Sequence, residues 1–358
     1  MRITGHDIIV IGTSGGGLEA LDTLIGQLPG DLPAAIFIAQ HMAAENSGEA
    51  LLHRLRRHRA FDCRLAKDGE SFKQGRVYIA PPNNHMLVKN TKLLVTKGAR
   101  ENRNRPSIDP LFRSAAVSHT SRVIGVLLTG LLDDGTAGLI AIQKCGGLTV
   151  VQNPKDAAYP GMPESALTNL KIDHCVPISA MGSLLETLVH EPPGKSKPIP
   201  KDVRTEAEIA ERVLSDVAAV TSLGKQVPYN CPECGGVLWE MNNPKVPRYR
   251  CHTGHAFTLS ALLESQGEKI EETLWVSLRM FEERKNLLNS THDPFAVRRA
   301  KETQIHIDRI RAILLDPRTW QLTLDRVKKS MSATVKTKSV REEEEREQKR
   351  RSKTRKKH

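Results

Sequence analysis

The sequence of 358 residues contains no run that approaches the ~20 consecutive apolar residues of a membrane-spanning helix. Its N-terminus enters an apolar, β-rich segment (DIIVIGT) without the pattern of a cleavable signal peptide. It has no internal repeat, and its first glycine-rich turn contains neither G-x-G-x-x-G nor a Walker lysine. We therefore expect a cytoplasmic protein without a membrane span.

Cysteine is scarce outside one short segment, and net charge is small outside the C-terminus. Three of the six cysteines lie between positions 231 and 251, and the others are scattered, so we predict reduced thiols instead of disulfides. The formal charge is +12, but the last ten residues, KRRSKTRKKH, carry seven Lys or Arg and no acid. The basic character therefore belongs mostly to a tail.

Short apolar runs alternate with helical patterns through the first half of the chain, as in DIIVIGT, GLEALDTLIGQL and AAIFIAQ. Nearly continuous apolar strands that alternate with helices indicate a parallel sheet covered on both faces. The fold class predicted is α/β, with a doubly wound, mostly parallel sheet. EPPGKSKPIPKD lacks apolar periodicity and marks the end of this domain. The predicted divisions are an α/β domain (1–190), a linker with a short helix (191–225), a metal module (226–258), a helical segment (259–320) and a charged, disordered tail (321–358).

The first strand is followed by Gly12-Thr13-Ser14-Gly15-Gly16, a G-x-S-x-G spacing between a strand and a helix. Such a turn can hold a nucleophilic serine at the carboxyl edge of a sheet, where the helix N-terminus offers N–H groups to an oxyanion. The same position in an α/β sheet also binds nucleotide phosphates. The turn by itself favours neither reading, and titration with nucleotides separates them.

Two further strand ends carry candidate partners for Ser14. His41 follows AAIFIAQ, and Asp133 and Asp134 lie in the loop after the apolar strand VIGVLLTG. A lone histidine is more often structural, and either aspartate could be only a helix cap. Three strands nevertheless deliver a serine, a histidine and an aspartate to one edge, which is how a serine-activating triad is assembled. The order Ser, His, Asp excludes an α/β-hydrolase.

The sequence resembles the chemotaxis protein-glutamate methylesterases, the CheB family. IGTSGGGLEA, AQHM and VLLTGLLDDGTAG are similar to the family's serine, histidine and aspartate segments. RVYIAPPNNHM, RPSIDPLF and VVQNPKDAAYPGMPESAL follow the family's order as well. The resemblance covers about half of the chain, and six ordered blocks make it specific.

The resemblance implies that Ser14 is the nucleophile, His41 the general base and Asp134 the residue that orients His41, with no catalytic cofactor. It implies ester hydrolysis on methylated cytoplasmic domains of chemoreceptors, extending to glutamine deamidation and to other chemosensory signalling proteins as partners. Gly15 stands where the family usually has Thr, and Leu131-Leu132-Asp133 where Met-Gly-Asn is usual, so substrate preference is open. We expect no receiver domain ahead of the strand that starts near Asp7. Arg105, before the helix start in RPSIDPLF, is either part of a docking face or an ordinary surface residue.

A second candidate site lies in NCPECGGVLWEMNNPKVPRYRCHTGHAF, which contains Cys231-x₂-Cys234 and Cys251-x₃-His255. This spacing predicts a zinc-ribbon-like module with a structural Zn²⁺ held by Cys231, Cys234, Cys251 and His255. His252 competes with His255 for the fourth position. The module resembles extensions of some receiver-less CheB-like proteins, and we expect it to dock, with the long helix, on a receptor or on the esterase.

An alternative function is a zinc-ribbon adaptor or nucleic-acid-associated protein with a catalytically altered α/β domain. Lys245, Arg248, Arg250 and the basic tail favour nucleic acid. The glutamate-rich helical segment that follows would repel phosphates, so nucleic acid is not expected to be a partner. The complete set of triad residues argues for the enzyme.

Overall fold

The computed structural model describes residues 5–213, 216–242, 246–291 and 293–316. The chain forms two compact units, which divide between Leu262 and Leu263. Among the described residues, no helix is both long and apolar enough to cross a membrane. The predicted tail, residues 321–358, lies outside the described residues.

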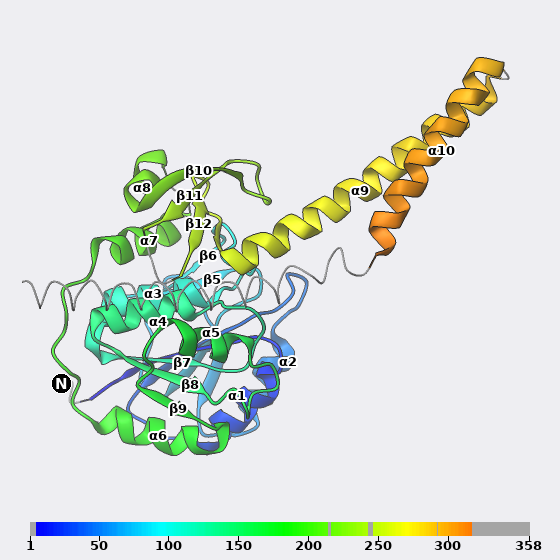
Figure 1. Ribbon diagram of the computed structural model, residues 1–358. Coiled ribbons are helices and arrows are strands. Elements are labelled where there is room, and N and C mark those ends of the chain that lie inside the picture. The colour runs from blue at the N-terminus through cyan, green and yellow to red at the C-terminus, as the bar shows by residue number, and fades with distance from the viewer. Residues whose placement is uncertain (1–4, 214–215, 243–245, 292, 317–358) are drawn as a thin grey trace, which may run out of the picture. The chain divides into compact units, whose positions relative to one another are not determined.

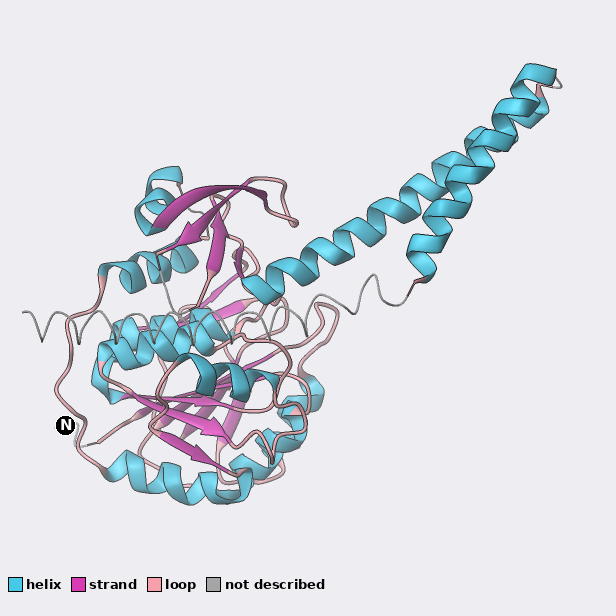
Figure 2. Cartoon of the chain, viewed as in Figure 1, coloured by secondary structure: helices cyan, strands magenta, loops and turns pink. Residues whose placement is uncertain are grey.

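A seven-stranded parallel sheet lies at the centre of the first unit, with helices on both of its faces (Figures 1 and 2). The strand order is β3-β4-β2-β1-β7-β8-β9, so the chain proceeds from β1 toward one edge and later toward the other. This confirms the predicted doubly wound α/β class, and ligand sites in such sheets lie where the strand order reverses. The strands are β1 (Ile8–Thr13), β2 (Ala35–Gln40), β3 (Asp62–Leu65), β4 (Arg76–Ile79), β7 (Val123–Leu127), β8 (Leu148–Gln152) and β9 (His174–Val176).

The residues of β1 show why both faces of the sheet are covered. Ile8 and Val10 belong to one buried apolar cluster, and Ile9 and Ile11 belong to another, because successive strand side chains point to opposite faces. Burying each of these side chains contributes about 1.5–3 kcal/mol. Helices α3 (Ile108–His119), α4 (Thr136–Cys145) and α5 (Gly161–Asn169) share the first cluster, and α1 (Gly17–Gln27), α2 (Glu49–Arg56) and α6 (Ile178–His190) share the second.

Three elements of this domain were not predicted, namely β3, β9 and α5. The two strands are short edge strands with mixed exposure, so their sequences (DCRL and HCV) carry no apolar pattern. Residues 85–96 form a separate two-stranded antiparallel sheet, β5 (His85–Lys89) with β6 (Lys92–Thr96). A short 3₁₀ turn, η1 (Thr120–Arg122), joins α3 to β7.

The rest of the first unit packs on the α/β domain and is not a free extension. The segment expected to be a linker contains helix α7 (Lys201–Arg212), which buries Val203, Ala207 and Ile209, and a second helix, α8 (Val217–Leu223). The first compact unit therefore continues past the predicted boundary at residue 190. The metal module is a four-stranded antiparallel sheet of β10 (Gly224–Asn230), β11 (Val237–Met241), β12 (Arg248–Cys251) and β13 (Ala256–Thr258).

The helical segment that follows consists of two helices, α9 (Leu259–Ser290) and α10 (Pro294–Leu315). Within the second unit they lie side by side (Figure 1). Phe281 of α9 stacks on His306 of α10, and Arg311 donates a hydrogen bond to Glu282. The predicted helical segment (259–320) therefore consists, in its described part, of two helices.

Candidate functional site

Ser14 and His41 lie beside each other because two neighbouring parallel strands end at the same edge. Thr13 of β1 is in register with Gln40 of β2, so the next residue of each strand is Ser14 or His41. The His41 N–H donates to the Thr13 carbonyl, which ties the two strand ends together. As a result, Ser14 Oγ lies 3.1 Å from His41 Nδ1.

Asp134 reaches the same edge from the other side of β1. It lies in the loop after β7, which is paired to β1. Its Oδ2 lies 2.7 Å from His41 Nε2, so the three predicted residues form a continuous Ser14–His41–Asp134 chain of hydrogen bonds. Asp133 does not join this chain, because its carboxylate accepts a hydrogen bond from Thr258.

The Asp134 carboxylate is buried and receives six hydrogen bonds. Two come from backbone N–H groups at the N-terminus of α3, where the helix dipole also favours a negative charge. The donors are His41 Nε2, Ser107 Oγ and Ile108 N on Oδ2, and Asn102 Nδ2, Asp109 N and Gly135 N on Oδ1.

These donors determine the ionisation of Asp134 and the tautomer of His41. Burial by itself would raise the pKa of Asp134, but the hydrogen bonds from His41, Ile108 and Asn102 outweigh it and hold the pKa at about 2. An ionised carboxylate only accepts hydrogen bonds, so the proton on His41 sits on Nε2. Nδ1 is therefore free to accept a proton from Ser14. Burial, followed by the charge of Asp134, raises the pKa of neighbouring Asp109 to about 7.

The serine turn is fixed by contacts that sequence reasoning did not find. Gln40 Nε2 donates to the carbonyl oxygens of Ser14 and His41, at 2.9 and 3.0 Å. Thr129 Oγ1 donates to the Gly15 carbonyl. A Cβ on Gly15 would lie 2.9 Å from the Tyr159 ring, so any larger side chain at this position would have to displace that ring.

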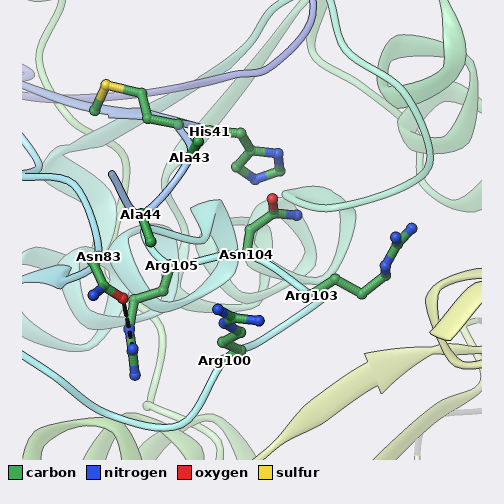
Figure 3. Close-up of a pocket in the computed structure, with 9 residues that line it drawn as sticks. His41, Ala43, Ala44, Asn83, Arg100, Arg103, Asn104 and Arg105 are labelled. Atoms are coloured by element: carbon green, nitrogen blue, oxygen red, sulfur yellow. Dashed lines mark hydrogen bonds between the residues drawn. The ribbon is translucent and has the colours of Figure 1, made fainter. Parts of the chain in front are cut away.

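A pocket of about 320 Å³ opens beside His41 (Figure 3). Arg100, Arg103 and Arg105 are among the residues that line it. Arg105 donates to Asn83 Oδ1 and to the Gly98 carbonyl, so it is a partly buried pocket residue and not an ordinary surface residue. The remaining lining residues are Met42, Ala43, Ala44 and Asn104.

The structure also brings together the four predicted metal ligands. One ligand atom from each of Cys231, Cys234, Cys251 and His255 lies within 4.8 Å of the others. Cys234 Sγ lies 3.7 Å from Cys251 Sγ, close to the ~3.8 Å that a tetrahedron with Zn–S bonds of ~2.3 Å requires. Within the described residues, His255 and not His252 belongs to the cluster. Three thiols and one imidazole at these distances fit a closed metal site.

Arg248 and Arg250, two of the basic residues that favoured nucleic-acid binding, are too buried to contact a nucleic acid. Arg248 and Arg250 are 7% and 1% exposed. Arg248 pairs with Glu206, and Arg250 pairs with both Glu101 and Glu206. They are internal ion-pair partners, because β12 faces the α/β domain and α7. Lys245 lies outside the described residues.

Comparison with known proteins assigns the family. Residues 9–185 match the family model described as CheB methylesterase. A Leptospira interrogans "Putative protein-glutamate methylesterase/protein-glutamine glutaminase" is 38% identical over 186 residues, which cover 50% of this chain and 93% of that protein. A "Protein-glutamate methylesterase/protein-glutamine glutaminase 2" of Rhodospirillum rubrum is 37% identical over 185 residues, or 51% of this chain and 50% of that one.

A solved structure agrees with these relatives. The Thermotoga maritima CheB methylesterase catalytic domain superposes with a TM-score of 0.50 and 33% identity, over 52% of this chain and 100% of that one. The residues that match the family model, 9–185, include Ser14, His41 and Asp134. The chain belongs to the CheB methylesterase family.

Proposed function

We propose that this chain hydrolyses methyl esters on glutamate side chains of chemoreceptor cytoplasmic domains, through an acyl-enzyme formed on Ser14. The observation that carries the proposal is the hydrogen-bonded chain from Ser14 Oγ through His41 to the buried Asp134 carboxylate. Family membership supplies the ester chemistry, and the three side chains supply the means to perform it.

Ser14 Oγ attacks the ester carbonyl while His41 Nδ1 takes its proton. The tetrahedral oxyanion collapses, and His41 returns the proton to the departing methoxide, which leaves as methanol. Water, deprotonated by His41, then attacks the acyl-enzyme and releases the glutamate carboxylate and Ser14. Asp134 stays ionised and stabilises the imidazolium that forms in each half-reaction. The same acyl-enzyme forms from glutamine when ammonia is the leaving group.

Backbone N–H groups of the serine turn are the candidates for an oxyanion hole. The N–H of Ser14 already donates to the Thr129 carbonyl, and that of Gly130 donates to the Tyr159 carbonyl. We therefore assign the role to the N–H groups of Gly15 and Gly16, just before α1. Each such donor typically contributes about 10²–10³ in turnover.

The pocket beside His41 suggests the charge of the substrate. The Arg100 side chain is 43% exposed, and its Nη1 lies 3.9 Å from Glu233 Oε1. Guanidinium groups that keep contact with water attract carboxylates that flank a scissile ester. We propose that the pocket receives an acidic stretch of the receptor helix, next to the methylated glutamate.

We expect the double substitution Arg100→Gln and Arg103→Gln to raise KM for an acidic methylated peptide about threefold to tenfold, since each exposed charge pair contributes about 0.2–1 kcal/mol. KM for a small neutral ester should not change, because no flanking carboxylate is lost. Arg57→Gln, at an exposed arginine after α2, is the matched control. If wild type, the double variant and Arg57→Gln had equal KM for the peptide, the pocket would not be the binding site for the acidic stretch.

Methanol release tests the proposed reaction directly. Purified full-length protein is incubated with receptor cytoplasmic fragments that carry methylated glutamates, and methanol and ammonia are measured in parallel. Methanol release supports the methylesterase, and ammonia release from glutamine-bearing fragments supports deamidation. Neither product from any fragment would contradict the proposed function.

We further propose that Cys231, Cys234, Cys251 and His255 hold a structural Zn²⁺. Zinc would supply closed tetrahedral coordination that stabilises the fold of the module. The turn of the first ligand pair suits this role. Gly235 adopts φ of +73°, and its N–H donates to the Cys231 carbonyl, which closes the turn between the thiols.

We expect the purified chain to contain about one zinc ion and the Cys234→Ser variant to lose it, because hard hydroxyl oxygen is a poor replacement for a thiolate. Cys175→Ser is the matched control, since Cys175 is exposed and lies outside the cluster. Elemental analysis of the three proteins makes the comparison. Equal zinc in wild type and Cys234→Ser would refute this site.

A further inference from the structure

The last strand of the metal module lies against the loop that borders the triad. Ala256 of β13 forms a bridge with Glu101. The Asn102 N–H donates to the Ala256 carbonyl at 2.8 Å, and the Ala256 N–H donates to the Arg100 carbonyl at 3.3 Å. The backbone of residues 100–102 therefore depends on β13 for its hydrogen bonds.

Thr258, at the end of β13, contacts both segments that hold Asp134. Its N–H donates to Asn102 Oδ1 at 3.1 Å, and its hydroxyl donates to Asp133 Oδ1 at 2.7 Å. Asp133 is the residue directly before Asp134. One threonine of the module thus touches the aspartate loop and the asparagine beside it.

Asn102 connects Thr258 to the triad, because it bonds to both Thr258 and Asp134. Its side-chain Nδ2 donates to Asp134 Oδ1 and to Asp109 Oδ2, both at 2.9 Å. It is 4% exposed and has φ of +49°, a conformation that asparagine tolerates better than most residues. With Thr258 on Oδ1, its amide is oriented so that the NH₂ faces the two carboxylates.

The metal ligands are joined to the same loop. Strand β12 ends at the ligand Cys251 and carries Arg250, whose guanidinium donates to Glu101 Oε1 at 2.9 Å. The same guanidinium donates to the Gly254 carbonyl, directly before the ligand His255. A change in the ligand turn would therefore reach Glu101 and Asn102 through short, buried contacts.

We infer that the metal module is a positioning element of the esterase. Thr258 of the module and Asn102 of the α/β domain together hold the Asp134 carboxylate in place for His41. Esterase turnover then depends on the folded, metal-loaded module. The inference rests on the proposed function, and it makes the C-terminal module a point at which the esterase can be controlled.

The test compares Thr258→Val with Thr258→Ser in the full chain. Valine keeps the shape and removes the hydroxyl, which donates to Asp133 and accepts from the Ala261 N–H, whereas serine keeps both bonds. With a small neutral ester, we expect kcat of Thr258→Val to fall about 10- to 100-fold at unchanged KM, since a ~1 Å misplacement can cost about 10²-fold. Thr258→Ser should stay within about threefold of wild type, as should Glu240→Gln, an exposed control on β11.

The pH profile separates positioning from general loss of structure. When the hydroxyl bond to Asp133 is lost, the residue directly before Asp134 is no longer fixed, and the Asp134 carboxylate moves away from its hydrogen-bond donors. A carboxylate with weaker donors holds the proton of the His41 imidazolium more strongly. The acid limb of kcat/KM should therefore move to higher pH in Thr258→Val. A protein that is only partly unfolded would lose rate equally at all pH values, and that result would overturn the inference.

Metal removal supplies a readout that does not depend on activity. After chelation of the full-length wild type, amide hydrogen exchange of Asn102 and Asp109 should accelerate, and added zinc should reverse it. Unchanged exchange and unchanged kcat would overturn the inference. If the metal-loaded wild type hydrolyses no ester, the proposed function fails instead, and the exchange experiment still decides whether the module holds the loop.

Discussion

Replacement of Ser14 by alanine is expected to abolish methanol release, with kcat lower by about 10⁶-fold, the typical effect of removing a triad serine. The reason is that Ser14 Oγ is the proposed nucleophile of the acyl-enzyme and lies 3.1 Å from His41 Nδ1, the proposed proton acceptor. Folding should not change, since Ser14 is anchored by its backbone N–H to Thr129 and by its carbonyl to Gln40.

Ser183→Ala is the matched control, because Ser183 lies on an exposed position of α6, far along the chain from the triad. A fluorophosphonate should label wild type and Ser183→Ala on Ser14 and leave Ser14→Ala unlabelled, as read by peptide mass spectrometry. Full turnover by Ser14→Ala, or labelling at another residue, would contradict the assignment of the nucleophile.

The triad could be proposed from sequence because each member follows a strand with a clear apolar pattern. Ser14 comes directly after β1 and His41 directly after β2, and parallel neighbours deliver such residues to one edge. Asp134 follows β7 by a short loop. The predictions that depended only on strand ends and fold class therefore named three residues that the structure brings together.

Asn102 and Ser107 could not be found in this way. Asn102 lies in a loop, and Ser107 lies directly before helix α3. Both donate to Asp134, which is distant from them in the sequence. For Arg105 in RPSIDPLF the sequence predicts a docking face or an ordinary surface position, yet Ser107 and Ile108 of this segment donate to Asp134. Contacts of this kind depend on how loops meet in space, for which a single sequence carries no pattern.

The first compact unit extends beyond the predicted boundary at residue 190, to Leu262, for a related physical reason. The stretch after residue 190 has the composition of a linker, and α7 has charged residues that patterning rules assign to a solvent-exposed face. In the structure Glu206 of α7 is 3% exposed and is surrounded by arginines from α3 and β12. A buried ion cluster holds α7 on the α/β domain beside its buried Val203, Ala207 and Ile209. The pairing of these charges has no pattern in the sequence.

Removal of one arginine from this cluster is the second large effect that we expect. Arg250→Ala should lower the free energy of unfolding of the first unit by about 3–5 kcal/mol, because Glu101 and Glu206 remain buried with a missing partner. Urea unfolding followed through buried Trp239, with Trp275→Phe and Trp320→Phe in the background, measures it. Arg212→Ala, at a 70% exposed arginine of α7, should change stability by less than about 1 kcal/mol.

The pH dependence of this difference distinguishes an ion pair from simple loss of packing. Burial would raise the pKa of Glu206, but Arg248, Arg113 and Arg250 outweigh it and hold the pKa below the usual 4.5. A carboxyl with a lowered native pKa stabilises the fold above its unfolded pKa, and this contribution is lost as the pH falls. The difference in the free energy of unfolding between wild type and Arg250→Ala should therefore be largest near pH 7 and should decrease below about pH 4.5. A gap that stays constant down to acid pH would mean that Arg250 acts through packing alone, and the electrostatic link between β12 and the α/β domain would have to be abandoned.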